Sequence, residues 1–167
     1  MKRVFILLLI LTVVPFVAFE QTQITPQPAY LKDPTIPSFK VYTCPDSVLF
    51  TKGDLPKGVP VVIIYFAPDC GHCQYEAKEI VHNMSKLENA FFLWVAFRPM
   101  NEIHEFGKKY DLEKFGNIKL ARDPKYFIPS FFKVEFTPFI AVYDSQGAFK
   151  KEFRMGAKPE ELIEAIK

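Results

Sequence analysis

The chain has 167 residues and a formal net charge of +2, from 21 basic and 19 acidic residues. Hydrophobic residues make up 49% of it, which predicts a folded domain with a real core and excludes a disordered chain. The sequence has no block of charge and no basic stripe with interleaved aromatic residues, so nucleic acid is not an expected partner. Three cysteines are too few for a small fold held together by disulfides.

The first 20 residues are expected to direct export. Lys2 and Arg3 precede an apolar run, Val4–Phe19, that is shorter than the ~20 residues needed to span a bilayer and matches the core of a signal peptide. The residues that follow lack a clean cleavage pattern, so an uncleaved membrane anchor through residues 4–19 stays open. We expect a protein exported to a bacterial periplasm or cell envelope, either released or anchored. Exported thiols lie where disulfides form and persist.

A proline-rich stretch separates the export segment from the fold. Residues 21–37 contain four prolines and no hydrophobic period, which predicts an extended spacer. The folded domain is then expected over residues 38–167. Two short strand patterns open it, Phe39–Thr43 and Val48–Thr51, and they predict a hairpin around Cys44–Ser47.

The centre of the domain is a strand followed by two cysteines. Val61–Phe66 is a continuous apolar run of strand length, typical of a strand buried on both faces. After a turn comes Cys70-Gly-His-Cys73, and a helical pattern then runs to about Glu88. Phe91–Phe97 is a second apolar run, so the helix is expected to join two parallel strands by a right-handed crossover.

The second half of the domain adds three strands and two helices. The elements expected after residue 100 are, in order, a helix over Asn101–Tyr110, a short strand at Ile118–Leu120, an apolar strand at Phe139–Tyr143, its hairpin partner at Ala148–Phe153 and a helix opened by Pro159. Asn101 is placed to cap the first of these helices. The aromatic stretch Tyr126–Phe132 has no assigned structure. The order is therefore β–α–β, a connecting region, and β–β–α.

This order resembles the thioredoxin superfamily, and within it the exported, membrane-tethered thiol–disulfide oxidoreductases of the TlpA/ResA kind. The resemblance covers roughly residues 39–167. It rests on the Cys70-x-x-Cys73 pair between strand and helix, on Glu76, on Thr137-Pro138 opening a strand, and on the closing hairpin with Gly147. It implies an α/β thioredoxin fold: a central mixed sheet, a βαβ half and then a ββα half, with an N-terminal strand or hairpin extension.

The two cysteines are the expected catalytic pair and redox disulfide. Thiol–disulfide exchange needs a thiolate, and a free cysteine with a pKa of ~8.5 is mostly protonated at neutral pH. The unpaired N–H groups and the positive dipole end at a helix N-terminus favour the anion. Cys70, at that end, is expected to attack a substrate disulfide, and Cys73, one turn inside, to resolve the mixed disulfide. This chemistry requires no cofactor.

Residues beside the pair are expected to tune it. Gly71 leaves the approach to Cys70 open, and His72, if protonated, stabilises the thiolate. Asp69 opposes thiolate formation and stands where thioredoxins carry a tryptophan. Ile64 stands where thioredoxins have a buried acid. The opposed effects of Asp69 and His72 leave the acidity of the pair open.

Two further sites come from the resemblance. Glu76 follows Cys73 by three residues and can face the pair from one turn away. In the TlpA/ResA kind a glutamate here assists proton transfer at the buried thiol; the alternative is an ordinary solvated glutamate. The resemblance also implies that Pro138 is a cis-proline facing the pair and that Thr137 offers backbone hydrogen bonds to a bound peptide. Taken alone, Pro138 would be a trans-proline at a strand entrance.

Other readings of the cysteines find less support. Structural zinc needs two more ligands of like kind, and Cys44 lies far upstream, so no metal is expected. Haem attachment requires histidine directly after the second cysteine, where Gln74 stands. A peroxiredoxin expects threonine three residues before the reactive cysteine, where Ala67 stands. Cys44 itself is either a small buried residue in a turn, a third redox cysteine or the site of an intermolecular link.

The predicted function is an exported thiol–disulfide oxidoreductase acting as an envelope reductant. It would exchange electrons with protein dithiols and disulfides through Cys70 and Cys73, and with an unidentified redox partner protein. Two alternatives remain: a client-binding module or holdase with incidental thiols, and a peroxiredoxin-like peroxidase.

Overall fold

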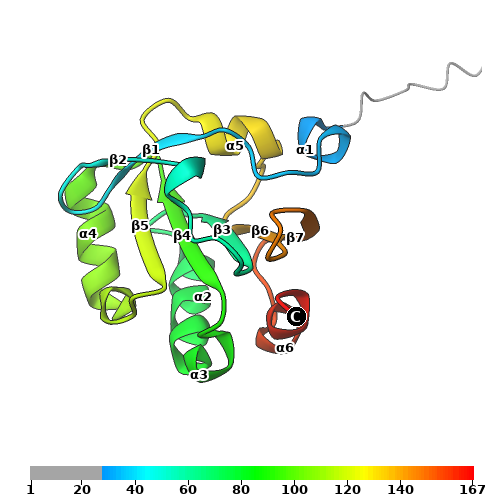
Figure 1. Ribbon diagram of the computed structural model, residues 1–167. Coiled ribbons are helices and arrows are strands. Elements are labelled where there is room, and N and C mark those ends of the chain that lie inside the picture. The colour runs from blue at the N-terminus through cyan, green and yellow to red at the C-terminus, as the bar shows by residue number, and fades with distance from the viewer. Residues whose placement is uncertain (1–27) are drawn as a thin grey trace, which may run out of the picture.

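The computed structural model describes residues 28–167. The predicted export segment and the first part of the predicted spacer lie outside the described residues. Within residues 28–167, no helix is long and apolar enough to cross a membrane. One mixed sheet forms the centre of the molecule, with helices on both of its faces (Figure 1).

The sheet has seven strands in the order β2-β1-β5-β4-β3-β6-β7. Their bounds are β1 Lys40–Thr43, β2 Leu49–Thr51, β3 Val61–Tyr65, β4 Phe91–Ala96, β5 Ile118–Arg122, β6 Phe139–Tyr143 and β7 Phe149–Arg154. Strands β3, β4 and β5 are parallel, and β6 runs antiparallel to β3. The remaining pairs, β1 with β2, β1 with β5 and β6 with β7, are antiparallel. The predicted thioredoxin-like mixed sheet is thereby confirmed.

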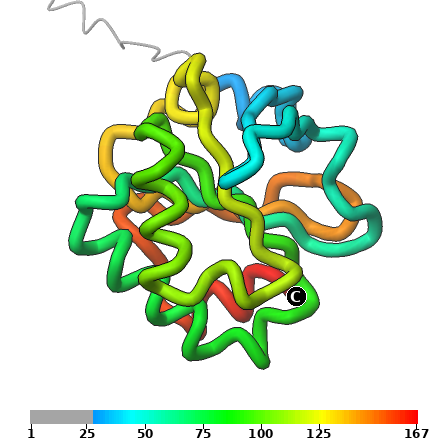
Figure 2. The backbone as a smooth tube through the Cα atoms, turned by 90° about the vertical axis from the view of Figure 1, so that its left-hand side faces the viewer, coloured from blue at the N-terminus to red at the C-terminus, as the bar shows by residue number. Residues whose placement is uncertain are grey.

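The helices form two layers around the sheet. They are α1 Ala29–Lys32, α2 Gly71–His82, α3 Met84–Leu87, α4 Met100–Lys109, α5 Phe127–Phe132 and α6 Pro159–Ala165, with short 3-10 turns η1 Lys52–Asp54 and η2 Leu112–Lys114. One hydrophobic core joins the sheet to α2, α3, α4 and α6. A second core joins its other face to α1 and α5. The described N-terminal end and the C-terminus lie far apart in both views (Figure 1 and Figure 2).

The strands lie where the sequence predicts apolar runs. All residues of β3 and β4 are buried, because each side chain faces one of the two helix layers. Ile63, for example, pairs with Leu93 and belongs to the second core, while its neighbour Ile64 belongs to the first. This arrangement fixes the end of β3, where the cysteine pair follows.

Two helix boundaries differ from the prediction. The helix expected to run to Glu88 ends at His82, because Asn83 leaves the helical conformation and its side chain donates a hydrogen bond to the Glu79 carbonyl at 2.9 Å. Helix α4 begins at Met100 with Pro99 as its N-cap. The prediction that Asn101 caps this helix is therefore wrong: that residue lies inside the first turn.

The predicted spacer is also shorter than expected. Helix α1 falls within it, and Tyr30 and Ile36 are only 2% and 5% exposed. The Tyr30 ring packs against Phe132 and Phe149, with centroids 5.4 and 5.5 Å apart. Burial of these aromatic rings outweighs the proline-rich composition, so residues 29–37 belong to the folded domain.

Candidate active site

The cysteine pair lies where β3 passes into α2. The turn after β3 closes with the Cys70 N–H donating to the Ala67 carbonyl at 3.1 Å. Cys70 is the N-cap of α2, with φ −82° and ψ 119°, and its thiol is half-buried. Cys73, in the first turn, is 0% exposed. Both cysteines are free thiols. An accessible thiol at the helix N-terminus is thus followed by an inaccessible one a turn away.

The surroundings shift the acidity of the two thiols in opposite directions. Burial raises the pKa of Cys70, but side-chain hydrogen bonds from Thr137 and Cys73 and the backbone N–H groups of Cys73 and His72 outweigh it, so the pKa is lowered. Burial raises the pKa of Cys73 to about 12. At neutral pH, Cys70 is therefore ionised to a greater extent than Cys73, and Cys70 is the cysteine that a substrate can reach.

The strand entrance at Thr137-Pro138 meets the cysteine pair. The peptide bond between these two residues is cis, as the resemblance implies. The Cys70 thiol donates to the Thr137 carbonyl at 3.4 Å. On its other side, Pro138 accepts a hydrogen bond from the Met155 N–H at 3.0 Å. The structure thus brings together two predicted parts of the site that are 67 residues apart along the chain.

Glu76 is not a solvated helix residue. It is 3% exposed, and its Oε2 accepts a hydrogen bond from the Ala157 N–H at 3.0 Å. Burial raises its pKa to about 7, although the Ala157 N–H opposes that shift. A buried carboxyl one turn beyond Cys73 that titrates near neutral pH can take or give a proton there.

Gly156 supports this carboxyl and was missed by the sequence analysis. Its φ of +98° lies in the left-handed region, and a Cβ on it would lie 2.7 Å from the Glu76 Oε2. Only glycine lets the loop after β7 approach so closely and place the Ala157 N–H on the carboxylate. The glycine two residues beyond the strand end is a signal for a turn, but it does not indicate this partner.

The two residues between the cysteines lie at the surface. Gly71 has no atom within 4 Å of the position that a Cβ would take, so it lies in open space beside Cys70. His72 is exposed and lines a cavity of about 350 Å³ together with Glu76 and Met155.

Asp69 has a cationic partner that the sequence did not reveal. Its Oδ2 lies 3.5 Å from an Arg98 guanidinium nitrogen, and the same arginine is 2.8 Å from Glu102. Arg98 follows the end of β4, which places it beside the turn before Cys70. Arg98 therefore partly offsets the negative charge next to Cys70. The expectation from the sequence set only Asp69 against His72 and did not include this third charge.

Cys44 is separate from this site. It follows β1, and its thiol donates to the Met100 carbonyl at 3.5 Å. Burial raises its pKa to about 11, with further contributions from Glu113 and Asp46. These surroundings favour the interpretation as a partly buried structural residue. Among residues 28–167, no cluster of three or more histidine, cysteine or acidic side chains is arranged to hold a metal ion.

Several exposed apolar side chains lie at the same end of the sheet as Cys70, beyond the C-terminal ends of the parallel strands. They are Tyr75, Phe97, Tyr126, Phe136 and Met155. Phe97, expected inside a buried strand, is 46% exposed just beyond β4 and contacts Tyr126 edge to face at 5.4 Å. Phe136 is 60% exposed and directly precedes Thr137. The surroundings of the thiol can therefore contact apolar parts of a larger molecule.

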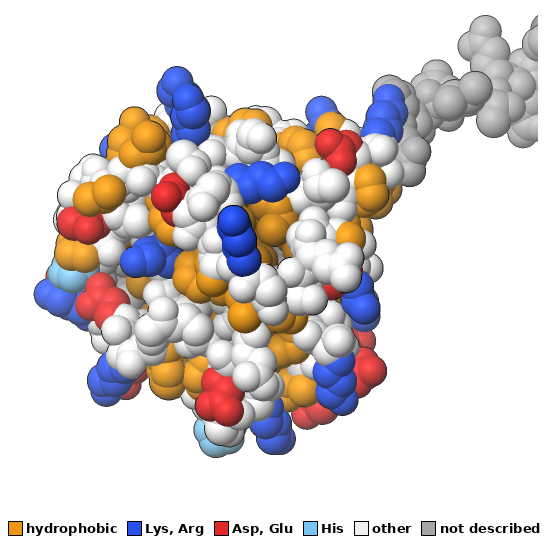
Figure 3. Space-filling model, viewed as in Figure 1, with side chains coloured by type: hydrophobic (Ala, Val, Ile, Leu, Met, Phe, Trp, Pro, Cys, Tyr) orange, Lys and Arg blue, Asp and Glu red, His pale blue; other side chains and the backbone are white. Residues whose placement is uncertain are grey.

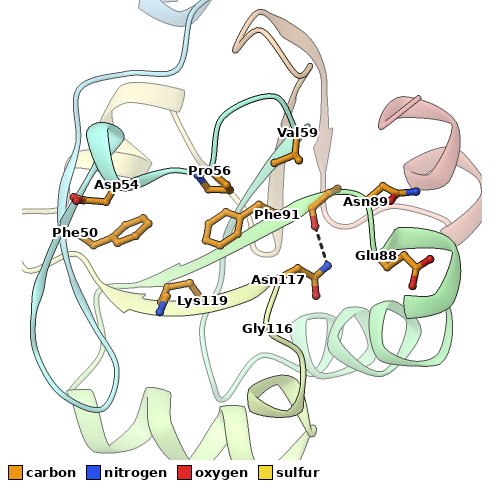
Figure 4. A pocket seen from close by; sticks show the side chains of 11 residues that line it. Phe50, Asp54, Pro56, Val59, Glu88, Asn89, Phe91, Gly116, Asn117 and Lys119 are labelled. Atoms are coloured by element: carbon orange, nitrogen blue, oxygen red, sulfur yellow. Dashed lines mark hydrogen bonds between the residues drawn. The ribbon is translucent and has the colours of Figure 1, made fainter.

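A cavity of about 630 Å³ lies at the other ends of the parallel strands (Figure 4). Phe50 and Phe91 stack beside it with centroids 6.3 Å apart. The amide of Asn117 donates to the Ala90 carbonyl at 2.8 Å, the bond dashed in the figure, and so serves the fold. No cysteine lines this cavity, so it does not belong to the thiol site.

Comparison with solved structures supports the fold. The structure of MTB dsbF in its mixed oxidized and reduced forms is 26% identical in sequence, with a TM-score of 0.67, and the match covers 79% of this chain and 97% of that chain. A secreted Mycobacterium tuberculosis disulfide oxidoreductase homologous to E. coli DsbE is 21% identical, with a TM-score of 0.65, over 77% of this chain and 94% of that one. A peroxiredoxin-like protein from Aquifex aeolicus is 18% identical, with a TM-score of 0.64, over 79% and 83%.

No protein-family model matches the sequence, and no curated protein matches it. The similarity to known proteins is therefore found in the fold. This similarity places the chain in the thioredoxin superfamily. Within that superfamily the structural neighbours support a thiol–disulfide oxidoreductase.

Proposed function

We propose that the protein is an exported thiol–disulfide oxidoreductase that reduces protein disulfides in the cell envelope through Cys70 and Cys73. The observation that carries this proposal is the contrast between the two thiols at the start of α2: Cys70 is accessible with a lowered pKa, and Cys73 is buried with a raised one. Export is supported by the apolar run over residues 4–19 and by the neighbour described as secreted.

Reduction begins at Cys70. Its thiolate attacks one sulfur of a client disulfide, the client S–S bond breaks, and the departing client thiolate takes a proton from water. A mixed disulfide now joins Cys70 to the client. We expect the backbone of Thr137, whose carbonyl oxygen lies 3.4 Å from the Cys70 sulfur, to hold the client backbone as an added strand.

Cys73 completes the reaction. Its proton passes to the Glu76 carboxylate, and the resulting Cys73 thiolate attacks the Cys70 sulfur, breaking the bond to the client. The second client thiolate leaves and is protonated. The client has gained two electrons, and Cys70 and Cys73 have lost them as a disulfide. A redox partner protein must then return two electrons to the pair.

The buried position of Cys73 calls for a base close to it. Burial makes Cys73 a poor acid, so its ionisation needs a base nearby. Glu76 is buried as well, lies one helical turn away, and is about half ionised at neutral pH with a pKa of about 7. We infer that Glu76 is this base. It then releases the proton to solvent through the cavity that it lines together with His72.

The test is the reduction of insulin disulfides by dithiothreitol, measured by turbidity. The Cys70→Ser variant is expected to lose the stimulation of this reaction, whereas Cys44→Ser, which also removes a half-buried thiol, is expected to retain it. Undiminished activity of Cys70→Ser would reject the proposal.

A client-binding module is the second candidate. The exposed Phe136 and the contacting pair of exposed Phe97 and Tyr126 favour it, because exposed apolar side chains can contact a protein partner. Comparison of the wild-type protein with the Cys70→Ser variant separates the two candidates. A wild-type protein that binds unfolded insulin chains and suppresses their aggregation without stimulating reduction would favour the module, whereas stimulation of reduction that is lost in Cys70→Ser would favour the oxidoreductase.

A further inference from the structure

A groove runs along the molecule between α2 and α4, which we name the α2–α4 groove. It consists of two adjoining cavities of about 500 and 580 Å³ that share Lys109 and Tyr110. The first is lined also by Pro68, Asp69, Glu102, Glu105 and Phe106, and the second by Gln74, Lys78, Val81, His82 and Asp111. Helix α4, at the left of Figure 1, faces the viewer in Figure 2.

The groove begins beside the redox thiol. Its lining includes Pro68 and Asp69, the two residues that directly precede Cys70. The Gln74 amide donates to the Pro68 carbonyl at 3.1 Å, which fixes this rim to the first turns of α2. A chain attached by sulfur to Cys70 can therefore enter the groove within one or two residues, since an extended residue spans ~3.4 Å.

The end of the groove beside Cys70 is acidic. Asp69, Glu102 and Glu105 line it, and Arg98 lies 3.5 Å from the first and 2.8 Å from the second. Two carboxylates thus share one guanidinium. Glu105 is 3.7 Å from Lys108 at the exposed surface, where such a contact contributes little.

The far end of the groove is net basic: Lys78 and Lys109 line it against one carboxylate, Asp111, whose Oδ1 lies 2.9 Å from the Lys114 ammonium nitrogen. Lys78 of α2 and Lys109 of α4 place their ammonium groups 5.9 and 5.4 Å from the centre of the same Tyr110 ring. Neither lysine forms an ion pair with any acidic residue in the part of the chain that the structure describes, residues 28–167. Between the two ends, the largely buried Phe106 and Tyr110 give the groove an aromatic floor.

We propose that the α2–α4 groove docks the extended segment of a client protein that flanks its reactive cysteine, with a basic side chain next to that cysteine and an acidic side chain beyond it. This rests on the proposed function, and it names the client chemistry that the site selects. The order of charges along the groove determines which client segment binds. A segment with the reverse order of charges would be repelled at both ends of the groove.

The spacing of the two charges follows from helix geometry. Glu102 and Lys109 are seven residues apart on α4, which corresponds to ~10 Å at 1.5 Å per residue. About three extended residues span that distance. The preferred client segment therefore carries its acidic residue about three positions beyond its basic one, with an apolar residue between them over Tyr110.

Binding without reaction tests the groove directly. The probes are fluorescent decapeptides in which serine replaces the reactive cysteine. Each carries lysine next to the serine and aspartate three positions beyond the lysine. One peptide has these charges on the N-terminal side of the serine, and another has them on the C-terminal side. Their twins have lysine and aspartate exchanged. Fluorescence anisotropy at low salt is expected to show about tenfold tighter binding of the first kind, a difference that shrinks at high salt.

Variants locate the effect. Lys78→Glu/Lys109→Glu is expected to remove or invert the preference, because both groove lysines are reversed. Lys40→Glu/Lys57→Glu changes net charge equally at exposed positions outside the groove and is expected to leave the preference intact. Equal affinity of the two peptide kinds, or an unchanged preference in the groove variant, would overturn the inference.

The reaction with 4,4′-dithiodipyridine keeps the two proposals apart. This small neutral disulfide tests Cys70 without a peptide, and its reaction is compared in the wild-type protein and in Cys44→Ala so that a contribution of Cys44 is recognised. A wild-type protein that binds the peptides with the expected order but fails to react would overturn the proposed function and leave the groove supported. The opposite result would overturn the groove alone.

Discussion

Cys70 and Cys44 form a natural comparison within one molecule. Both are half-buried, both follow a β-strand, both contact the core formed with α2 and α4, and both donate to a backbone carbonyl, at 3.4 and 3.5 Å. Yet the pKa of Cys70 is lowered, and that of Cys44 is raised to about 11. Burial raises both pKa values. At Cys70 it is outweighed by hydrogen bonds from the Thr137 and Cys73 side chains and from backbone N–H groups of α2, whereas at Cys44 the nearby acids Glu113 and Asp46 raise the pKa further. Burial alone therefore does not decide whether a thiol in this protein is reactive.

The largest expected effect is on alkylation. At pH 7, Cys44 with a pKa of about 11 is almost wholly protonated, whereas the lowered pKa of Cys70 leaves far more thiolate. Iodoacetamide is expected to modify Cys70 at least about 100-fold faster than Cys44, measured by mass spectrometry of peptides after timed quenching. Similar rates would show that the helix N-terminus does not set the reactivity.

The next effect concerns Glu76, whose acidity separates the two thiol environments further. Its pKa in the folded protein is about 7, above the ordinary value of 4.5, so the folded state binds this proton more tightly than the unfolded state. The stability contribution is then present below pH ~4.5 and is lost as the pH rises to about 7. Glu76→Gln is expected to raise the free energy of unfolding by about 3 kcal/mol at pH 8 and by little at pH 4.

Urea unfolding at several pH values measures this, with Glu88→Gln as the control, since Glu88 is exposed and does not contribute to the raised pKa of Glu76. The account also predicts that Glu76→Gln slows release of a client from the mixed disulfide while leaving formation of that disulfide unchanged. A stability gain of the same size at both pH values would contradict the raised pKa.

A smaller effect is expected from the loop that covers Glu76. Gly156→Ala places a Cβ 2.7 Å from the Glu76 Oε2 and forces a side chain into the left-handed region, so it is expected to cost about 1–3 kcal/mol. Gly116→Ala is the control, since no atom lies within 4 Å of its Cβ position. Thermal unfolding of both variants measures the difference; equal melting temperatures would show that the loop does not need this approach.

The smallest effect is expected from Arg98. Arg98→Ala removes the cation beside Asp69 and is expected to raise the pKa of Cys70, because the Asp69 charge is then less offset. The pair is exposed, so the change in Cys70 alkylation rate should stay within about a factor of two or three. The pH dependence of that rate measures it, and a lowered pKa would contradict the arrangement.

Sequence reasoning predicted the strands well because apolar runs such as Val61–Phe66 report burial on both faces directly. The motif spacing also predicted that Cys70 and Cys73 lie at the start of a helix, and the resemblance implied the cis bond at Thr137-Pro138 that lies beside them. Its errors arose where long-range contacts decide: Tyr30 folds part of the predicted spacer onto α5, and Asn83 ends α2 before Glu88.

The same limit applies within the site. The helix spacing predicts that Glu76 can face the pair, but its burial depends on a loop 80 residues further along, which includes Gly156. The partnership of Arg98 with Asp69 depends on β4 lying beside β3. Neither contact has a local signal in the sequence. On the face drawn in Figure 3, acidic and basic side chains are interspersed, consistent with the absence of a basic stripe in the sequence.

The most direct test of the account is the reduction potential of the Cys70–Cys73 pair, measured by equilibration with dithiothreitol and glutathione buffers in the Cys44→Ala protein. The account predicts a single two-electron transition with a potential closer to about −270 mV than to about −120 mV, as expected of a reductant. A potential near −120 mV, or the failure of Cys70 and Cys73 to form a disulfide in any buffer, would contradict it.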